Sequence, residues 1–157
     1  MQVRAYTSAD ADAVWSMLMP VFRAGDTYAI DPNISRDDAL AYWTAHHTYV
    51  AVVDGEPLGT FYIRPNQQGG GAHICNCGYV TARGAEGRGI AREMLQFSLM
   101  EAKSLGFEAM QYNFVLANNA RAIATWKRAG FEEIGHIPKA FKSAGTYVDA
   151  LILYRAL

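Results

Sequence analysis

The sequence predicts an α/β protein in which a mixed, mostly antiparallel central sheet carries helices on both faces. Three observations support this class. Short strand-like runs alternate with longer stretches of helical periodicity. Asp54-Gly55, between two strand-like runs, indicates a β-hairpin and therefore antiparallel pairing in the first half. A helix flanked by strand-like runs at residues 72–81 and 109–115 indicates a parallel, right-handed crossover in the second half.

The expected element order is β-α-α-β-β-β-α-β-α-β-β. In chain order the elements are a strand at 3–7, helices at 8–23 and 35–45, strands at 48–53, 57–64 and 72–81, a helix at 90–105, a strand at 109–115, a helix at 119–129 and strands at 132–137 and 147–154.

Capping residues and two glycines set the helix boundaries. Ser8 and Ser35 are N-cap residues that precede acidic first turns. The last two helices each end in a Gly-Phe pair, Gly106-Phe107 and Gly130-Phe131, the pattern of a glycine at C′ with an apolar residue at C″. Pro20 lies late in the first helix and is expected to kink or end it.

Length and composition predict one globular domain over residues 1–157. With 14 Lys and Arg against 15 Asp and Glu, the formal charge is −1, which gives no electrostatic basis for binding nucleic acid or an anionic membrane. A bound anion must therefore be held locally. Two cysteines, with no disulfide framework, fit a reducing cytoplasm. The apolar run at 13–22 is too short for a membrane anchor and lacks the basic flank of a signal peptide.

A glycine-rich turn at residues 84–89 is the segment that indicates chemistry. Its core, Glu86-Gly87-Arg88-Gly89-Ile90-Ala91, lies between a strand and a helix. Glycines permit positive φ and close approach of the backbone, and a helix start directs unpaired N–H groups outward. Such a site suits a pyrophosphate, with Arg88 and Arg83 adding positive charge. The spacing matches neither a dinucleotide fingerprint nor a P-loop, and an ordinary βα turn with solvated arginines stays an alternative.

Two segments at this separation resemble the GNAT superfamily of N-acetyltransferases. The strand Cys77-Gly78-Tyr79-Val80 and the glycine segment are similar to that family's acetyl-CoA pyrophosphate loop, Gln/Arg-x-x-Gly-x-Gly/Ala. Asn119-x-x-Ala122-x-x-x-Trp126-x-x-x-Gly130-Phe131 is similar to its Asn-x-x-Ala…Gly-Phe helix. The element order matches that fold over nearly the whole chain. Segments at 73–79, 110–115 and 147–151 are similar to a subgroup that acetylates proline analogues such as azetidine-2-carboxylate.

The resemblance implies direct transfer of an acetyl group from acetyl-CoA to the amine of a small molecule, amino and imino acids included. The cofactor-binding residues that it implies are Val80, Thr81, Arg83, Gly87, Arg88, Gly89, Ile90, Ala91, Asn119 and Trp126. Two positions depart from the family pattern. Glu86 stands where the motif has Gln or Arg and must point away from the anion. Trp126 stands where many members carry a tyrosine that protonates the leaving thiolate, and an indole N–H cannot act as that acid near neutral pH.

Asn76 and Asn113 are the predicted catalytic side chains. Both lie within strands expected to be central, which are normally apolar. A buried amide without a partner costs about 1–3 kcal/mol, so each needs a partner or a ligand. Facing a cleft between splayed strands, they would orient the acceptor or the acetyl oxygen; the alternative is pairing with backbone in the core.

The resemblance implies that Thr27 and Tyr28 line the acceptor pocket, and Tyr147 is expected at a second wall of it. For Thr27 and Tyr28 the alternative is a surface loop anchored by one aromatic residue. Lys142 or Arg64 would suit a substrate carboxylate, and nothing in the sequence chooses between this role and simple surface charge.

No metal site is expected. His73, Cys75 and Cys77 share one face of a strand, but three such residues span about 13 Å, too far for one ion with Zn–S bonds near 2.3 Å. The expected partner is a small-molecule amine. The apolar strand at 150–153 suits either a central position or a homodimer contact. Two other classes stay open: a non-catalytic acyl-CoA-binding regulatory module, favoured by Trp126, and a structural homo-oligomer with a vestigial cleft.

Overall fold

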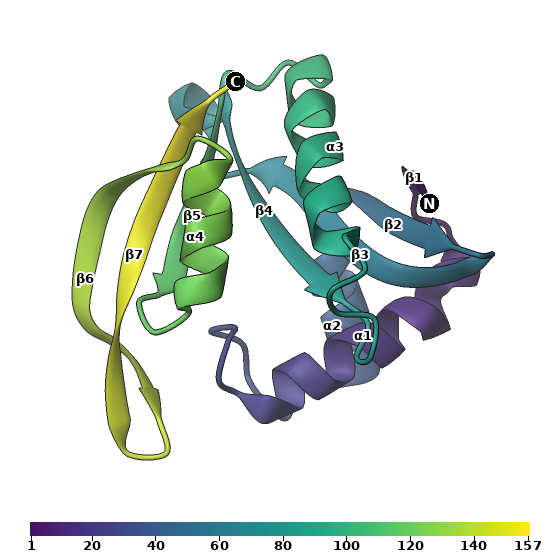
Figure 1. Cartoon of the computed structure of the whole chain (residues 1–157), viewed down its shortest axis with the longest axis horizontal. Coiled ribbons are helices and arrows are strands. Elements are labelled where there is room, and N and C mark those ends of the chain that lie inside the picture. The colour runs from purple at the N-terminus through teal and green to yellow at the C-terminus, as the bar shows by residue number, and fades with distance from the viewer. The chain divides into compact units, whose positions relative to one another are not determined.

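The structure, a computed structural model, describes all residues from 1 to 157. It confirms the predicted fold class and element order (Figure 1). The strands are β1 (Gln2–Ala5), β2 (His47–Val53), β3 (Glu56–Pro65), β4 (Ile74–Thr81), β5 (Ala109–Leu116), β6 (Glu132–Ser143) and β7 (Thr146–Ala156). The helices are α1 (Ala11–Ala24), α2 (Arg36–Trp43), α3 (Ile90–Ser104) and α4 (Ala120–Arg128), with short 3₁₀ turns at Ser8–Asp10 and Gly69–Gly71.

The strands are hydrogen bonded in the order β1-β2-β3-β4-β5-β7-β6. Strand β1 pairs antiparallel with β2, β2 with β3, β5 with β7 and β6 with β7, whereas β4 pairs in parallel with β5 and sets Ile74 opposite Ala109. The hairpin and the crossover are therefore both present. Asp54 and Gly55 have φ angles of 52° and 86°, as a type I′ hairpin turn requires.

The first helix begins later than predicted, and Pro20 does not end it. Its first turn is a 3₁₀ turn at Ser8–Asp10, so that α1 proper begins at Ala11, and Thr7 rather than Ser8 is the capping residue. Pro20 lies inside α1, which continues to Ala24. An interior proline costs about 3 kcal/mol; the helix continues because the turns on either side bury Leu18 and Phe22 completely or nearly so.

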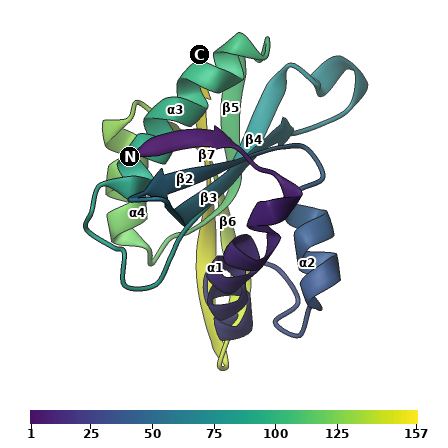
Figure 2. The same ribbon diagram turned by 90° about the vertical axis from the view of Figure 1, so that its right-hand side faces the viewer.

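The chain forms two compact units, one of Met1–Arg64 with Cys77–Glu101 and one of Pro65–Asn76 with Ala102–Leu157. In the first unit, α1 and α2 lie on one side of the strands and α3 on the other (Figure 2). Alternation along the strands explains the two faces. Tyr49 and Phe61 contact Phe97 of α3, at ring-centroid distances of 5.6 and 6.1 Å, whereas their neighbours Val50 and Tyr62 point to the α1–α2 side.

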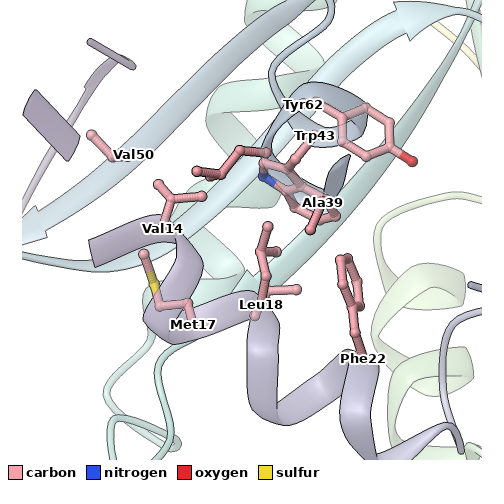
Figure 3. Packing of buried hydrophobic residues seen from close by; sticks show 10 residues of the cluster. Val14, Met17, Leu18, Phe22, Ala39, Trp43, Val50 and Tyr62 are labelled. Atoms are coloured by element: carbon pink, nitrogen blue, oxygen red, sulfur yellow. The ribbon is translucent and has the colours of Figure 1, made fainter. Parts of the chain in front are cut away.

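The main core of the first unit lies between α1, α2 and the sheet (Figure 3). Its buried members are Val14, Met17, Leu18, Phe22, Ala39, Leu40, Trp43, Val50, Tyr62 and Val80. The indole N–H of Trp43 donates to the Thr60 hydroxyl at 3.0 Å, and that hydroxyl donates to the Tyr49 carbonyl at 3.0 Å. The indole N–H and the hydroxyl buried in this core therefore both have hydrogen-bond partners.

In the second unit, the Gly-Phe pairs end their helices as predicted. The N–H of Phe131 donates to the Trp126 carbonyl at 3.1 Å, and Gly130 has a φ of 89°. The N–H of Phe107 makes the equivalent bond to Ala102 at 3.0 Å. Both are Schellman motifs, and the first stacks Phe131 on Tyr112 of β5, with ring centroids 4.4 Å apart.

A buried ion pair joins β1 to the turn before α1. The Asp10 carboxylate is 5% exposed and accepts two N–H bonds from Arg4, both 2.8 Å, and one from the Thr7 backbone at 2.8 Å. The hydrogen bonds from Arg4 lower the pKa of Asp10 to about 2. Because the pKa of an unfolded aspartate is about 3.9, the stability from this group is complete above pH about 4 and is lost as the pH falls toward 2.

We expect Asp10→Asn to lower the free energy of unfolding at pH 7 by about 2 kcal/mol, because hydrogen bonds to charged groups contribute about 1.5–3 kcal/mol. The difference from wild type should shrink as the pH falls from 4 to 2. Urea unfolding at both ends of that range measures it. Asp12→Asn, at an exposed ion pair with Arg36, should change stability by under about 0.5 kcal/mol. Equal effects of the two variants would contradict this reading of Asp10.

Candidate active site

The glycine loop joins the end of β4 to the start of α3. Gly84, Gly87 and Gly89 have φ angles of 82°, 79° and 79°. No other atom lies within 4 Å of the place where a Cβ on any of them would be. The backbone of the loop therefore borders open space, while Ile90, 1% exposed, anchors its end in the core.

The start of α3 suits an anion. The first N–H groups of a helix have no intrahelical acceptor and lie at the positive end of its dipole. The Glu86 carboxylate accepts the N–H of Gly84 at 2.8 Å and is engaged within its own loop. Arg88 contacts only the exposed carboxylate of Asp54, at 3.7 Å, a surface pair that contributes little. The loop thus fits a diphosphate held by backbone amides.

Close packing fixes where this helix begins. A Cβ on Gly59 of β3 would lie 2.8 Å from Ile90 Cγ2 and 2.8 Å from Met94 Sδ. Only glycine lets the first turn of α3 approach the strand so closely. The position of the loop is therefore set by the sheet beneath it.

The backbone of β4 has two distinct edges. The N–H of Asn66 donates to the Ile74 carbonyl and the N–H of Ala82 to the Leu58 carbonyl, both at 2.8 Å. Both bonds fit the same antiparallel offset between β3 and β4. Even-numbered residues of β4 therefore direct their backbone groups toward β3, and odd-numbered residues direct theirs to the opposite edge.

This alternation separates the predicted cofactor contacts on β4. The backbone groups of Val80 point toward β3, and its side chain belongs to the main core. The backbone N–H and C=O groups of Tyr79 and Thr81 point to the opposite edge of β4. At that edge the Tyr28 hydroxyl donates to the Tyr79 carbonyl at 2.9 Å and accepts the Tyr79 N–H at 3.0 Å.

Tyr28 anchors the loop after α1, which is one of the two readings that the sequence left open. Its ring contacts Phe22 and Trp43 at centroid distances of 5.8 and 6.0 Å. Burial raises the pKa of Tyr28, so the phenol stays protonated at neutral pH. Thr27 is exposed, and its hydroxyl donates to the Asp26 carboxylate at 3.2 Å.

Beside Tyr28 lie further polar groups of the first unit that sequence reasoning did not single out. Tyr42 of α2 and Tyr62 of β3 both contact the guanidinium of Arg64, which the sequence offered only as one of two cations. The feature of the sequence that could have indicated this cluster is the spacing of Tyr62 and Arg64. Two residues apart on a strand, they share one face.

Asn76 and Asn113 meet at Gln111 of β5. The Asn76 amide donates to the Gln111 carbonyl at 3.0 Å, directly after the backbone pairing of β4 with β5. The Gln111 amide donates to Asn113 Oδ1 at 3.0 Å, and the Asn113 amide donates to Asn66 Oδ1 at 2.6 Å. Asn76 is buried and bonded to backbone, as one alternative foresaw, whereas Asn113 is exposed.

A bulge in β5 explains the exposure of Asn113. Tyr112 pairs with Leu153 of β7 and Val115 with Leu151, so β5 holds one residue more than its partner between these pairs. A bulge turns side chains away from their regular faces. No glycine or other residue in the sequence marks this position.

The remaining predicted contacts lie in the second unit. The Asn119 side chain caps α4 by accepting the Ala122 N–H at 3.3 Å. Trp126 is half-buried against Tyr112, at a centroid distance of 4.9 Å. Tyr147 is 53% exposed, with the Lys142 ammonium 5.3 Å from its ring centre.

Cys75 and Cys77 are buried thiols, and His73 is exposed. No three His, Cys, Asp or Glu side chains gather where they could hold a metal ion. No helix has both the length and the apolar character needed to cross a membrane.

Comparison with known proteins identifies the family. The model of the acetyltransferase (GNAT) family matches residues 12–131. The chain belongs to the GNAT family. The N-acetyltransferase aca1 of Schizosaccharomyces pombe is 32% identical over 82% of this chain and 71% of that protein. A GCN5-related N-acetyltransferase from Kribbella flavida is 35% identical, covers 99% of this chain and 97% of its own, and superposes with a TM-score of 0.94.

Among more distant structures, a phosphinothricin acetyltransferase from Sinorhizobium meliloti in complex with acetyl-CoA has a TM-score of 0.88 at 18% identity, over 99% of this chain and 88% of its own. That likeness supports the fold. The family match and the close relatives establish an acetyl-CoA-dependent acyltransferase that is, at the family level, an N-acetyltransferase.

One titratable pair of the acetyltransferase lies on β6 and β7. His136 Nε2 is 2.7 Å from Asp149 Oδ2, and Nδ1 is 3.6 Å from Glu133. The hydrogen bond with Asp149 raises the pKa of His136 and lowers the pKa of Asp149. The histidine's stabilisation is complete below its unfolded pKa of about 6.5 and is lost above its folded pKa; the aspartate's is complete above about 3.9 and is lost on acidification below its folded pKa.

We expect NMR titration to give His136 a pKa above 6.5 and Asp149→Asn to return it to the ordinary range. Glu133→Gln should move the pKa less, because that contact is longer. An unshifted wild-type His136 would show that the pair does not form in solution.

Proposed function

We propose that this acetyltransferase binds the diphosphate of acetyl-CoA through the backbone amides of Gly87–Ala91 and transfers the acetyl group directly to the amine of a small molecule. The observation that carries the proposal is the run of positive-φ glycines, open to space at their Cβ positions, at the N-terminus of α3. Arg83 and Arg88 supply positive charge at the same loop. The resemblance to enzymes that acetylate proline analogues points to an amino or imino acid as acceptor.

The odd-numbered edge of β4 is the strand edge that suits the pantetheine arm. Thr81 directs its N–H and C=O to that edge, next to the glycine loop, whereas Val80 directs its own toward β3. Acetyl-CoA supplies an activated thioester. A backbone N–H that polarises a reacting carbonyl contributes about 3 kcal/mol to the transition state. Asn119 and Trp126 of α4 complete the proposed cofactor contacts, and residues 1–157 form one acetyltransferase domain in this proposal.

A second candidate is a non-catalytic acyl-CoA-binding module. Trp126 favours it, because the ring packs against Tyr112 and offers no phenol to protonate the thiolate. This module would bind coenzyme A and release no free thiol with any amine. The homodimer and the cytoplasmic location expected from the sequence stay predictions.

Coenzyme A at 100 times its Kd should stabilise the protein by about 2.7 kcal/mol. Gly89→Ala is expected to weaken binding about tenfold, because alanine resists positive φ, which lowers that stabilisation to about 1.4 kcal/mol at the same concentration. Thermal unfolding with and without coenzyme A measures both values.

Gly145→Ala is the matched control. Gly145 has the same φ of 79° and equally open surroundings, in the β6–β7 turn. Both variants should lose similar intrinsic stability, about 1–2 kcal/mol, but Gly145→Ala should keep the full response to coenzyme A. If both variants lose their stabilisation by coenzyme A, the effect is not specific to the glycine loop, and the loop is not supported as the cofactor site.

Asn113→Ala should lower the acetylation rate at least tenfold while lowering Tm by only a few degrees, since Asn113 is exposed and bonds only side chains. Steady-state thiol release and thermal unfolding measure the two effects. Gln67→Ala, an exposed polar change in the loop before β4, should leave both unchanged. If Asn113→Ala acetylates at the wild-type rate, the Asn113 amide makes only surface contacts and has no part in the reaction.

A further inference from the structure

Arg64 is held in an aromatic setting that the acetyl-transfer function alone does not explain. Its guanidinium carbon lies 4.6 Å from the ring centre of Tyr62 and 4.9 Å from that of Tyr42. One N–H group donates to the Tyr42 hydroxyl at 3.0 Å. The two rings help to hold the guanidinium in place, since each attracts the cation through its ring face.

The charge of Arg64 has no counter-ion within the protein. Arg4, Arg36 and Arg88 each pair with an aspartate, whereas no Asp or Glu lies within ion-pair distance of Arg64. Of its five N–H donors, the Tyr42 hydroxyl accepts from one. The guanidinium is half-buried beside rings of low polarity, where attraction to an anion is stronger than in bulk water.

The neighbouring phenols do not offset this charge. Burial raises the pKa of Tyr28 and of Tyr62, so both stay neutral across the physiological range. The cluster of Tyr28, Tyr42, Tyr62 and Arg64 therefore carries one positive charge and several hydroxyl groups. A planar guanidinium matches a carboxylate through two parallel N–H bonds.

The cluster lies against β4, the strand that runs into the glycine loop. A Cβ on Gly78 would be 2.9 Å from the Tyr62 hydroxyl, so glycine is needed for the ring to lie there. At the next residue, the Tyr28 hydroxyl bonds both backbone groups of Tyr79. A carboxylate on Arg64 would thus lie on the same face of the sheet as the tyrosines that contact this strand.

We propose that Arg64 binds the carboxylate of an amino or imino acid acceptor. The inference rests on the proposed function and adds the residue that recognises the carboxylate. Lys142, the other cation that the sequence offered, is exposed and lies over the exposed ring of Tyr147. It lacks the enclosure that fixes Arg64.

Wild-type protein provides the first test. Thiol release from acetyl-CoA is measured with the standard amino acids, proline among them, and with the primary amide of each. The best acceptors should carry a carboxylate, with kcat/KM about 10- to 100-fold above that of the matched amide, as expected for hydrogen bonds to a charged group. If amides or simple amines react as well as the acids, the inference is wrong, but the proposed function still stands. No release with any amine, despite coenzyme A binding, would overturn both.

Variants assign the discrimination to Arg64. Arg64→Gln should raise KM for the carboxylate acceptor about 10- to 100-fold and leave both the kinetics of its amide and the coenzyme A stabilisation unchanged. Comparing acid with amide in each variant cancels their difference in basicity. Lys142→Gln should behave as wild type. Equal losses for acid and amide would mean that Arg64 only supports the rings, and would overturn the inference.

Arg64→Lys covers the case in which Arg64→Gln does not fold. Lysine keeps the charge and the apolar stem but loses the bidentate geometry. It should show part of the loss for the acid and none for the amide. If Arg64→Lys and Lys142→Gln both prefer the acid over its amide as strongly as the wild type does, bidentate recognition at Arg64 is contradicted.

Discussion

The pair of hydrogen bonds between the Tyr28 hydroxyl and the backbone of Tyr79 is the interaction on which the site depends. A buried N–H or C=O without a partner costs about 1–3 kcal/mol, and one side chain here satisfies both groups of a strand residue. The same contact ties the loop after α1 to β4 and closes the ring cluster with Phe22 and Trp43. It thereby sets the tyrosines and Arg64 beside the strand that leads to the glycine loop.

Glycines let the other parts approach that strand. Gly59 admits the first turn of α3, and Gly78 admits the ring of Tyr62. The loop glycines serve differently: they adopt positive φ and leave the backbone uncovered. In the proposed function, an acetyltransferase of almost no net charge would use two local anion sites, one of backbone amides for a diphosphate and one of a single arginine for a carboxylate, without a broad basic surface.

Local signals were enough to predict the element order, the hairpin, both Schellman ends and the glycine loop, because turns and caps depend on near neighbours in the chain. Features that depend on register or tertiary packing were not accessible. The bulge that exposes Asn113 and the partner of Tyr28 arise from segments far apart in sequence. For Asn76, the sequence left open whether its partner is backbone or a ligand, and only the pairing of β4 with β5 decides this. Pro20 does not end its helix, because burial of its neighbours outweighs the hydrogen bond that it removes.

Residue-resolved amide exchange of the protein with and without saturating coenzyme A tests the central claim most directly. If backbone amides hold the diphosphate, exchange at Gly87–Ala91 should slow strongly on binding, while the turn at Gly145, a glycine with the same φ of 79°, should exchange as before. Stabilisation of the whole protein with exchange at Gly87–Ala91 unchanged would contradict the account, because the cofactor would then be held elsewhere.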